Sequence, residues 1–370
     1  MQPCVDSFFM EAAARMKKIF AVLLVLALIF CSTGCAAEYR KYSNTYLGVF
    51  DTEIIIMGYA TSQAAFDEVA DEAIALLKEY NQIFDAYNSY PGLNNLWYIN
   101  RYAGQAPVEI PKPLYDLIAW CKGMWDGGRQ ETNIAMGAVL SIWHDYRTAG
   151  LENPANAVLP PMDQLLEARL HTDMADVILD EEKCTVYFAD PLLRLDIGAV
   201  AKGWAADALQ EYLSAKMPSF LLSLGGNVLS GEAPMDGRRH WGVSVQDPDA
   251  ENLLFSNDIL DVLYVDQLSV VTSGDYWRYY TVDGKKYHHI IDSKTLMPAE
   301  YIQAVTVVCP SSLMADFLTT TLFVMPYEEG LRLIESIPDA EALWSLMDGT
   351  VKMSSGMSAY AKSLGATAYD

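Results

Sequence analysis

Residues 195–204 read Leu-Asp-Ile-Gly-Ala-Val-Ala-Lys-Gly-Trp, and this stretch is central to predicting the fold. The apolar residues 192–197 indicate a strand that delivers Asp196, a glycine then predicts a turn, and residues 200–215 predict a helix. The first turn of a helix has free N–H groups and the positive end of the helix dipole, so this junction favours a bound phosphate. Lys202 adds a positive charge there. Taken alone, the segment is better explained as an ordinary helix start with a surface lysine.

A second segment, residues 311–321, reads Ser-Ser-Leu-Met-Ala-Asp-Phe-Leu-Thr-Thr-Thr. The serines predict the start of a helix that runs to Val324. Asp316 and Thr320 are four residues apart, so they share one face of that helix. Both present hard oxygen atoms, which suit Mg²⁺ better than zinc. The alternative is a solvated aspartate beside threonines that bond back to carbonyls one turn earlier.

Two further segments carry polar groups on predicted hairpins. Residues 271–276 read Val-Thr-Ser-Gly-Asp-Tyr, and residues 287–292 read Tyr-His-His-Ile-Ile-Asp. Neighbouring side chains of a strand face opposite ways, so only one of His288 and His289 can face a pocket. Residues 220–227, Phe-Leu-Leu-Ser-Leu-Gly-Gly-Asn, predict a tight hairpin that is either a plain turn or a place where backbone approaches a ligand.

The remaining pattern predicts an α+β fold with mixed or antiparallel sheets, because hairpins dominate the second half and no regular βαβ repeat occurs. Asp283-Gly284 is the strongest hairpin signal. Loops are expected at 87–100 and 153–161. The other predicted helices cover residues 61–80, 113–125, 132–143 and 162–170, and the other predicted strands cover residues 49–59, 177–179, 185–188, 220–224, 228–230, 241–246, 276–282, 285–291 and 304–308.

Composition and charge exclude several classes of protein. The chain has 370 residues, 52% of them hydrophobic, which provides enough apolar material for a buried core. Its 25 Lys and Arg against 48 Asp and Glu give a net charge of −23, so a nucleic-acid backbone would be repelled. A negatively charged substrate therefore requires a locally positive site or a bound cation. The six cysteines and five histidines lack the spacing of a zinc site.

The N-terminal residues predict that the protein is located outside the cytoplasm. Lys17 and Lys18 precede an apolar run at 19–31, which is shorter than the roughly 20 residues of a spanning helix but fits a signal peptide. Ser-Thr-Gly-Cys at 32–35 resembles a bacterial lipobox, although Ser32 stands where Leu is usual. We therefore expect Met16 to be the true start, residues 1–34 to be a signal peptide, Cys35 to be lipidated, and 35–45 to form a tether. The alternative is an ordinary signal peptide.

The motifs, in this order, resemble the ApbE family of FAD:protein FMN transferases. The match runs from about Tyr46 to the C-terminal region and is carried by DIGAVAKGWAAD, LLSLGGN, VVTSGDYWRYY, HIID and ADFLTT. The resemblance implies one domain over residues 46–370. It also implies a two-lobed, T-fold-like architecture in which FAD binds in a cleft between the lobes. Many members of this family are lipoproteins, as the N-terminus also indicates here.

The resemblance assigns roles to individual residues. Tyr87 matches the aromatic residue that flanks the flavin, and His289 matches the pocket histidine, which we expect to be catalytic with Asp292 as a helper. The other FAD contacts that it implies are Thr132, Asn133, Asp196, Lys202 and Ile291, and the implied Mg²⁺ ligands are the Ala199 carbonyl, Asp316 and Thr320. The chain departs from the family pattern at Asn133, where many members have Asp, at Thr319, and at Ser293 and Leu296 after HIID.

The implied function is the Mg²⁺-dependent transfer of FMN from FAD to a Thr or Ser hydroxyl of a partner protein, with release of AMP. The expected partners are FMN-binding proteins of an extracytoplasmic redox system, and the expected location is the outer face of a bacterial membrane. Two alternatives remain open from the residues. One is hydrolysis of FAD to FMN and AMP at the same site, and the other is a flavin-binding lipoprotein without catalysis.

Overall fold

The computed structural model describes residues 38–250 and 258–369. The chain divides into two compact units, residues 1–40 and 41–370, and the description below concerns the second. The predicted signal peptide and the lipidation site at Cys35 lie outside the described residues. In the part that is described, no helix combines the length and apolar character needed to cross a membrane.

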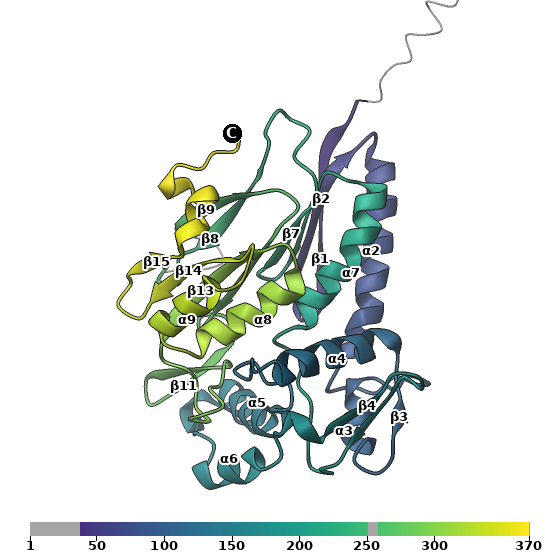
Figure 1. Ribbon diagram of the computed structural model, residues 1–370, viewed down its shortest axis with the longest axis vertical. Coiled ribbons are helices and arrows are strands. Elements are labelled where there is room, and N and C mark those ends of the chain that lie inside the picture. Colours follow the sequence, from purple (N-terminus) through teal and green to yellow (C-terminus); the bar gives the residue numbers. More distant parts are fainter. Residues whose placement is uncertain (1–37, 251–257, 370) are drawn as a thin grey trace, which may run out of the picture. The chain divides into compact units, whose positions relative to one another are not determined.

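An eight-stranded sheet forms the centre of the fold (Figure 1). Its strand order is β1-β2-β6-β7-β10-β13-β14-β15. The strands are β1 Arg40–Val49, β2 Thr52–Ala60, β6 Phe220–Leu224, β7 Asn227–Ser230, β10 Ser269–Gly274, β13 Ile302–Cys309, β14 Glu341–Leu346 and β15 Val351–Met353. From β2 to β15 each neighbouring pair runs antiparallel, as expected of a sheet built from hairpins.

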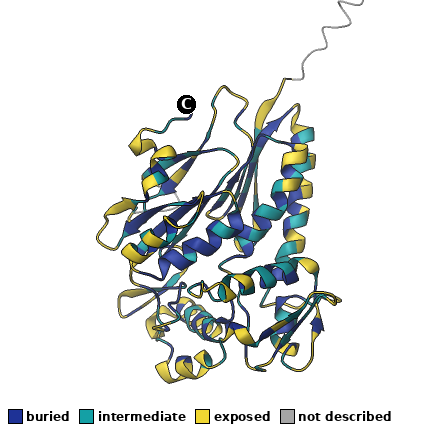
Figure 2. Cartoon of the chain, in the orientation of Figure 1, coloured by how far each residue is buried: buried dark blue, intermediate teal, exposed yellow. Residues whose placement is uncertain are grey.

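Three helices pack against this sheet, namely α2 (Gln63–Phe84), α7 (Ala201–Lys216) and α8 (Ser312–Phe323). Helix α8 contacts β7, β10, β13 and α7, so ten of its twelve residues are buried. It appears almost entirely dark blue in Figure 2, unlike the solvent-facing α2. A helix that is apolar on every side is typical of such a central position. Any polar side chain on α8 therefore needs a partner or a ligand.

The other elements surround this core. A three-stranded sheet has the order β3-β5-β4, and two hairpin-like pairs are β8-β9 and β11-β12. Their strands are β3 Val108–Glu109, β4 Val177–Asp180, β5 Thr185–Phe188, β8 Trp241–Gln246, β9 Ile259–Val265, β11 Tyr279–Val282 and β12 Lys285–His288. The remaining helices are α3 Leu96–Tyr102, α4 Lys112–Asp126, α5 Gly137–Glu152, α6 Met162–Arg169 and α9 Tyr327–Ile334, with short 3-10 turns at Pro154–Asn156, Met174–Asp176, Ser355–Ala359 and Lys362–Leu364.

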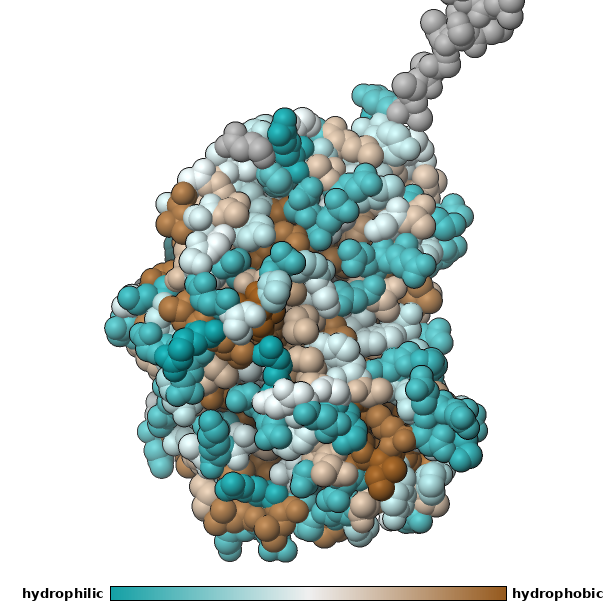
Figure 3. All heavy atoms as spheres, in the orientation of Figure 1, coloured by the Kyte–Doolittle hydropathy of each residue, from teal (hydrophilic) through white to brown (hydrophobic). Residues whose placement is uncertain are grey.

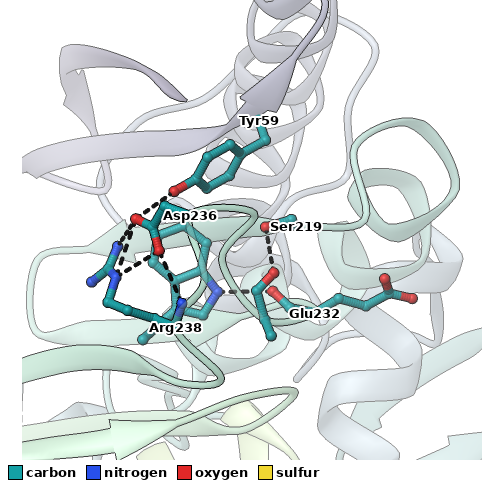
Figure 4. Close-up of polar contacts among 7 residues, drawn as sticks. Tyr59, Ser219, Glu232, Asp236 and Arg238 are labelled. Carbon is teal, nitrogen blue, oxygen red and sulfur yellow. Dashed lines mark hydrogen bonds and ion pairs between the residues drawn. The ribbon is translucent and has the colours of Figure 1, made fainter. Parts of the chain in front are cut away.

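The surface of this unit carries both paired charges and exposed apolar side chains. Between β7 and β8, Asp236 accepts a hydrogen bond from the Tyr59 hydroxyl at 2.8 Å and pairs with the Arg238 guanidinium at 2.7 Å (Figure 4). Apolar side chains gather over α6 at the lower end of Figure 3, where Met162, Leu166 and Leu170 are exposed at four-residue intervals.

The α+β class and most predicted elements are confirmed. The predicted helices at 61–80, 113–125, 162–170 and 200–215 correspond to α2, α4, α6 and α7, and the helix from Ser311 corresponds to α8, which Ser311 caps. Both predicted tight turns are present, because Gly225 and Gly226 have φ of +49° and +97°, and Asp283 and Gly284 have φ of +48° and +80°. These left-handed values are those that a two-residue hairpin requires.

Several predicted boundaries are wrong. The strand expected at 49–59 is a turn at residues 50–51 followed by β2, and β1 already begins at Arg40. Residues 40–45, expected in a tether, therefore belong to the sheet. The loop expected at 87–100 contains the start of α3. The strands expected at 276–282 and 285–291 are shorter, since β11 begins at Tyr279 and β12 ends at His288.

Two corrections concern the segments that position the site. The strand predicted at 192–197 is extended chain with one isolated bridge, between Arg194 and Met136. The helix predicted from Thr132 begins only at Gly137. The reason is that residues 134–137 bond to the segment around Arg194, with the Asp196 N–H donating to the Ile134 carbonyl and the Gly137 N–H donating to the Arg194 carbonyl.

Candidate active site

The contact between α7 and α8 is unusually close at Gly203. A Cβ at this position would lie 2.4 Å from the Ser312 carbonyl oxygen, so only glycine fits without displacement. The Gly203 N–H donates to Asp316 Oδ2 at 2.9 Å. In a regular helix this N–H would bond to the carbonyl four residues earlier, which is that of Ala199. Among the described residues that carbonyl accepts no other hydrogen bond, so it is left available to a ligand.

Asp316 is a buried carboxylate whose charge is only partly compensated. Asp316 is only 4% exposed, and this burial raises the pKa of its carboxyl group. The Lys202 charge, the Gly203 N–H and the Asn227 amide oppose that rise. Lys202 in turn donates to Asn227 Oδ1 and, at 3.3 Å, to the Gly225 carbonyl. The fully buried Asn227 therefore bonds to the ammonium and lowers the pKa of the carboxylate, although its Nδ2 meets the geometric criteria of no hydrogen bond in the described chain.

The three consecutive threonines of α8 differ in what their hydroxyls do. Thr319 donates to the Asp316 carbonyl at 2.8 Å, and Thr321 donates to the Phe317 carbonyl at 3.0 Å. Thr132 also bonds to the Phe317 carbonyl and lies 2.8 Å from the Thr321 hydroxyl, so it ties its loop to α8. Of these three threonines, Thr320 is the one whose hydroxyl makes no hydrogen bond in the part of the chain that the structure describes.

These oxygen atoms fit a hard divalent cation. The Asp316 carboxylate keeps one oxygen beyond its bond to Gly203. The Ala199 carbonyl and the Thr320 hydroxyl have no hydrogen-bond partner in residues 38–250 and 258–369. One charged and two neutral oxygen donors leave coordination positions for phosphate oxygens and water, as is common for Mg²⁺ at nucleotides. Residues 38–250 and 258–369 contain no cluster of three or more His, Cys, Asp or Glu residues that could hold a metal.

A second group of candidate site residues includes an aromatic pair. The Tyr87 ring stacks on His144, with 4.6 Å between the ring centroids and 28° between the planes. Arg147, one turn further along α5, places Nη2 3.2 Å from His144 Nδ1. Burial raises the pKa of Tyr87 to about 12, and the carboxylate of Asp196 contributes to that rise. Asp196 itself accepts the Gly198 N–H at 2.8 Å, which holds the turn before α7.

The two adjacent histidines have different environments, as the strand geometry predicts. His288 is buried, accepts the Ile290 N–H at Nδ1 and donates from Nε2 to the Ala299 carbonyl, so both nitrogen atoms are used. In the described chain His289 makes one hydrogen bond, of 3.2 Å, from Nδ1 to the Arg278 carbonyl. Since a carbonyl only accepts, Nδ1 carries the proton and Nε2 keeps a lone pair. Burial, with the nearby Arg278 charge, lowers the pKa of His289 to about 3.

Other predicted site residues have structural bonds. The Asp292 carboxylate accepts the Lys294 N–H at 2.8 Å and lies 3.4 Å from the Tyr301 hydroxyl, so it holds the turn after β12, and no hydrogen bond joins it to His289 among the described residues. Ile291 is buried and bridges to Pro298. The Asn133 amide accepts the Ala135 N–H and donates to the Thr172 carbonyl, so its side chain holds its own loop.

Four residues of this site were not singled out from the sequence. They are His144, Arg147, Asn227 and Arg278, which couple to Tyr87, Asp316, Lys202 or His289. Asn227 ends the Gly-Gly-Asn turn and Arg278 ends the Gly-Asp-Tyr-Trp-Arg segment, so both lie in quoted motifs. His144 and Arg147 had no such signal, because they lie on an ordinary amphipathic helix.

The fold and the site together define a class of protein. Hard oxygen donors, three cations and a neutral histidine around one site on an α+β scaffold are suited to binding and reacting with a phosphate ester. Comparison with known proteins places the chain more narrowly. It belongs to the ApbE family, whose model matches residues 50–344.

Two curated relatives match nearly the whole chain. A protein of Treponema pallidum named FAD:protein FMN transferase is 32% identical over 351 residues, which are 90% of this chain and 93% of that protein. A protein of the same name from Klebsiella pneumoniae is 30% identical over 324 residues, with 86% and 93% of the two chains covered.

Solved structures share the fold. The ApbE protein of Thermotoga maritima superposes with a TM-score of 0.73 at 24% identity, over 86% of this chain and 97% of that one. The flavin transferase ApbE of Vibrio cholerae gives a TM-score of 0.70 at 20% identity, over 87% and 100%. The expected ApbE-like architecture is therefore confirmed.

Proposed function

We propose that this protein transfers FMN from FAD to a Thr or Ser hydroxyl of a partner protein and releases AMP. The names of its relatives in the ApbE family support this activity. The observation that carries the proposal is the α7–α8 contact. There the Gly203 N–H bonds to Asp316 and leaves the Ala199 carbonyl without a partner, beside a cationic lysine.

Binding of the substrate follows from the charges of the site. Lys202 supplies the positive charge that an FAD diphosphate requires on a chain of net charge −23. Asp316, Thr320 and the Ala199 carbonyl would hold Mg²⁺, which would supply further positive charge for the phosphates. Tyr87 offers an aromatic face for the flavin ring, and Asp196 holds the turn that presents the α7 N-terminus.

His289 is the proton acceptor in this proposal. Its Nε2 has a free lone pair, because Nδ1–H is bonded to the Arg278 carbonyl. As the acceptor hydroxyl oxygen attacks the FMN phosphorus, its proton passes to Nε2 and a new P–O bond forms. The P–O bond to AMP breaks, and AMP leaves with the electron pair. The negative charge of bound FAD raises the low pKa of His289, which makes the imidazole a better base.

The decisive experiment is mass spectrometry of a candidate acceptor after incubation with FAD, Mg²⁺ and the protein. We expect an added FMN on one Thr or Ser, and none when that residue is changed to Ala or when EDTA is in excess. AMP release without acceptor would identify the hydrolase alternative. FAD binding without AMP release in either condition would identify the flavin-binding alternative, and it would overturn the proposal.

We further propose that the protein is anchored by lipid at Cys35, on the outer face of a bacterial membrane, and that its partners are FMN-binding proteins of a redox system there. The apolar run at 19–31 and the Ser-Thr-Gly-Cys junction support this address. Cys35→Ser should abolish lipid labelling and release the protein from the membrane fraction. A Cys35→Ser protein that is processed normally and stays membrane-bound would contradict the anchor.

A further inference from the structure

Arg278 is the charged residue that connects the separate parts of the site. Burial is the first cause that lowers the pKa of Lys202 on α7, of Arg147 and His144 on α5, and of His289 after β12, and the positive charge of Arg278 adds to that lowering. Tyr279 of β11 pairs with His288 of β12, so Arg278 and His289 are the next opposite residues and their side chains leave the same face of the hairpin. The residue itself is exposed, immediately before β11.

The guanidinium has no protein counter-charge in the described chain. In residues 38–250 and 258–369 it makes no hydrogen bond and no ion pair. Arg238 is a useful contrast, because its guanidinium forks onto Asp236 (Figure 4). The other two cations do interact with carboxylates, because the negative charge of Asp196 raises the pKa of Arg147 and that of Asp316 raises the pKa of Lys202, each against the effect of burial.

Three cations therefore converge on a protein whose net charge is −23. The charge of Arg278 acts on both Arg147 and Lys202, where it adds to the lowering of the pKa that burial causes. Such a cluster costs free energy in the empty protein, and a bound anion removes that cost. The arrangement indicates an anion that bridges α7 and the β11–β12 hairpin.

The main chain of Arg278 has a second contact. Its carbonyl accepts the His289 Nδ1–H at 3.2 Å, so one residue orients the imidazole and also places a guanidinium next to it. These two contacts are separable by mutation, because any substitution retains the carbonyl. A side-chain variant thus tests the guanidinium alone.

We propose that Arg278 is a phosphate-binding residue whose guanidinium contacts the non-bridging oxygens of the phosphate that faces His289. The identity of that phosphate, in FAD, rests on the proposed function. A guanidinium suits this position because its planar fork can donate two parallel hydrogen bonds to phosphate oxygens. In the reaction the guanidinium would stabilise the negative charge on the oxygens of the phosphate that the acceptor hydroxyl attacks.

The test compares flavins with and without phosphate. FAD, FMN and riboflavin are titrated by flavin fluorescence into wild-type protein and Arg278→Gln, in EDTA so that no metal contributes. Loss of a charge-assisted hydrogen bond typically weakens binding about 10- to 100-fold. We expect that loss for FAD and FMN, and a change of less than about twofold for riboflavin. Arg278→Lys, which keeps the charge without the fork, should lie between wild type and Arg278→Gln.

The matched control is Arg332→Gln, an exposed arginine on α9, which should bind all three flavins as wild type does. Equal affinities of Arg278→Gln and wild type for FAD and FMN would overturn the inference. An equal loss of affinity for riboflavin would also overturn the inference, because the effect of the mutation would then concern the flavin ring or the fold. The inference would likewise be overturned if wild-type protein bound FAD no more tightly than riboflavin. The proposed function is judged separately, by the FMN adduct on the acceptor.

Discussion

Single atoms, rather than whole residue types, distinguish the functional positions of α8. Thr319, Thr320 and Thr321 have the same side chain on the same helix, yet two of their hydroxyls bond to carbonyls of α8 and the third does not. Likewise Asp207 and Asp316 are both carboxylates at the α7–α8 contact. Asp207 accepts the Ser312 and Leu313 N–H groups and the Ser311 hydroxyl, so it caps α8.

The first prediction at this scale concerns Asp316. Asp316→Asn keeps the shape and an oxygen for the Gly203 N–H but removes the only formal negative charge among the proposed Mg²⁺ ligands. We expect transfer of FMN to be abolished and the Mg²⁺-dependent rise in Tm to be lost, while FAD binding without metal changes little. Thermal melts at increasing Mg²⁺, together with AMP release, measure both.

Asp207→Ala is the control for that variant. It removes a helix cap and should cost about 1–2 kcal/mol of stability, yet keep the response to Mg²⁺. Full activity of Asp316→Asn, or of the wild type in excess EDTA, would contradict the metal site.

The second prediction separates two neighbouring threonines. Thr320→Val should leave the Tm unchanged, because its hydroxyl makes no hydrogen bond in the described chain, but should lower the apparent affinity for Mg²⁺. Thr319→Val loses a bond to the Asp316 carbonyl and one from Ser273, which should cost about 1–3 kcal/mol of stability. Urea unfolding with and without Mg²⁺ measures both effects, and the opposite pattern would reject the assignment of Thr320.

At the scale of elements, the decisive feature is the close approach of two helices. Because Gly203 has no side chain, the N-terminus of α7 touches the backbone of α8 and the carboxylate of Asp316. The turn at Gly225 and Gly226 brings Asn227 and the Gly225 carbonyl to Lys202. Neither contact depends on an apolar pattern, because the first requires the steric fit of a glycine and the second is made by hydrogen bonds.

The third prediction belongs to this contact. Gly203→Ala places a Cβ within 3 Å of α8 backbone atoms, so the helices must separate, at a cost of about 1–3 kcal/mol and with loss of activity. Gly123→Ala is the matched control in α4, because a Cβ there meets no atom within 4 Å. That variant should be neutral or more stable by up to about 1 kcal/mol. Chemical denaturation compares them, and equal stability of the two variants would refute the steric argument.

At the scale of the whole molecule, one buried and two half-buried histidines link stability to pH. The folded protein holds His289 at a pKa of about 3, and burial lowers the pKa of His288 and His144 as well. An unfolded histidine has a pKa of about 6.5. Between these values the unfolded chain binds protons that the folded chain does not, so these groups reduce stability as the pH falls through this window.

The fourth prediction follows from that linkage. The free energy of unfolding of the wild type should include a decrease, due to protonation of His289 in the unfolded chain, as the pH falls from 6.5 to about 3. The variant His289→Gln should lack this decrease. Comparing the variant with wild type at each pH is necessary, because buried carboxylates such as Asp316 and Asp207 have raised pKa values and act in the opposite direction. Tm measured from pH 8 to pH 4 provides the comparison. A difference that does not change with pH would contradict the buried, neutral state of His289.

Much of this molecule follows from the sequence by itself. Periodicity and turn residues were sufficient for α2, α4, α6, α7, α8 and the two left-handed hairpin turns, because those signals are local. The strand alternation correctly predicted that His288 and His289 have different environments, whereas the role of His289 came from the resemblance and stays a prediction. The motif order indicated the family, which the family match confirmed. The assigned ligand roles of Asp316, Thr320 and the Ala199 carbonyl stay predictions.

Only the tertiary structure decided how those segments meet. Helix α5 begins late because residues 134–137 bond to residues 194–196, which are far away in the chain and invisible to a local pattern. No local pattern in the sequence marks Arg278 or Arg147, and only the folding of α5 and the β11–β12 hairpin brings their charges to act on His289. The physical reason is that electrostatic and steric terms depend on distances in space, whereas sequence patterns report which face of an element is apolar.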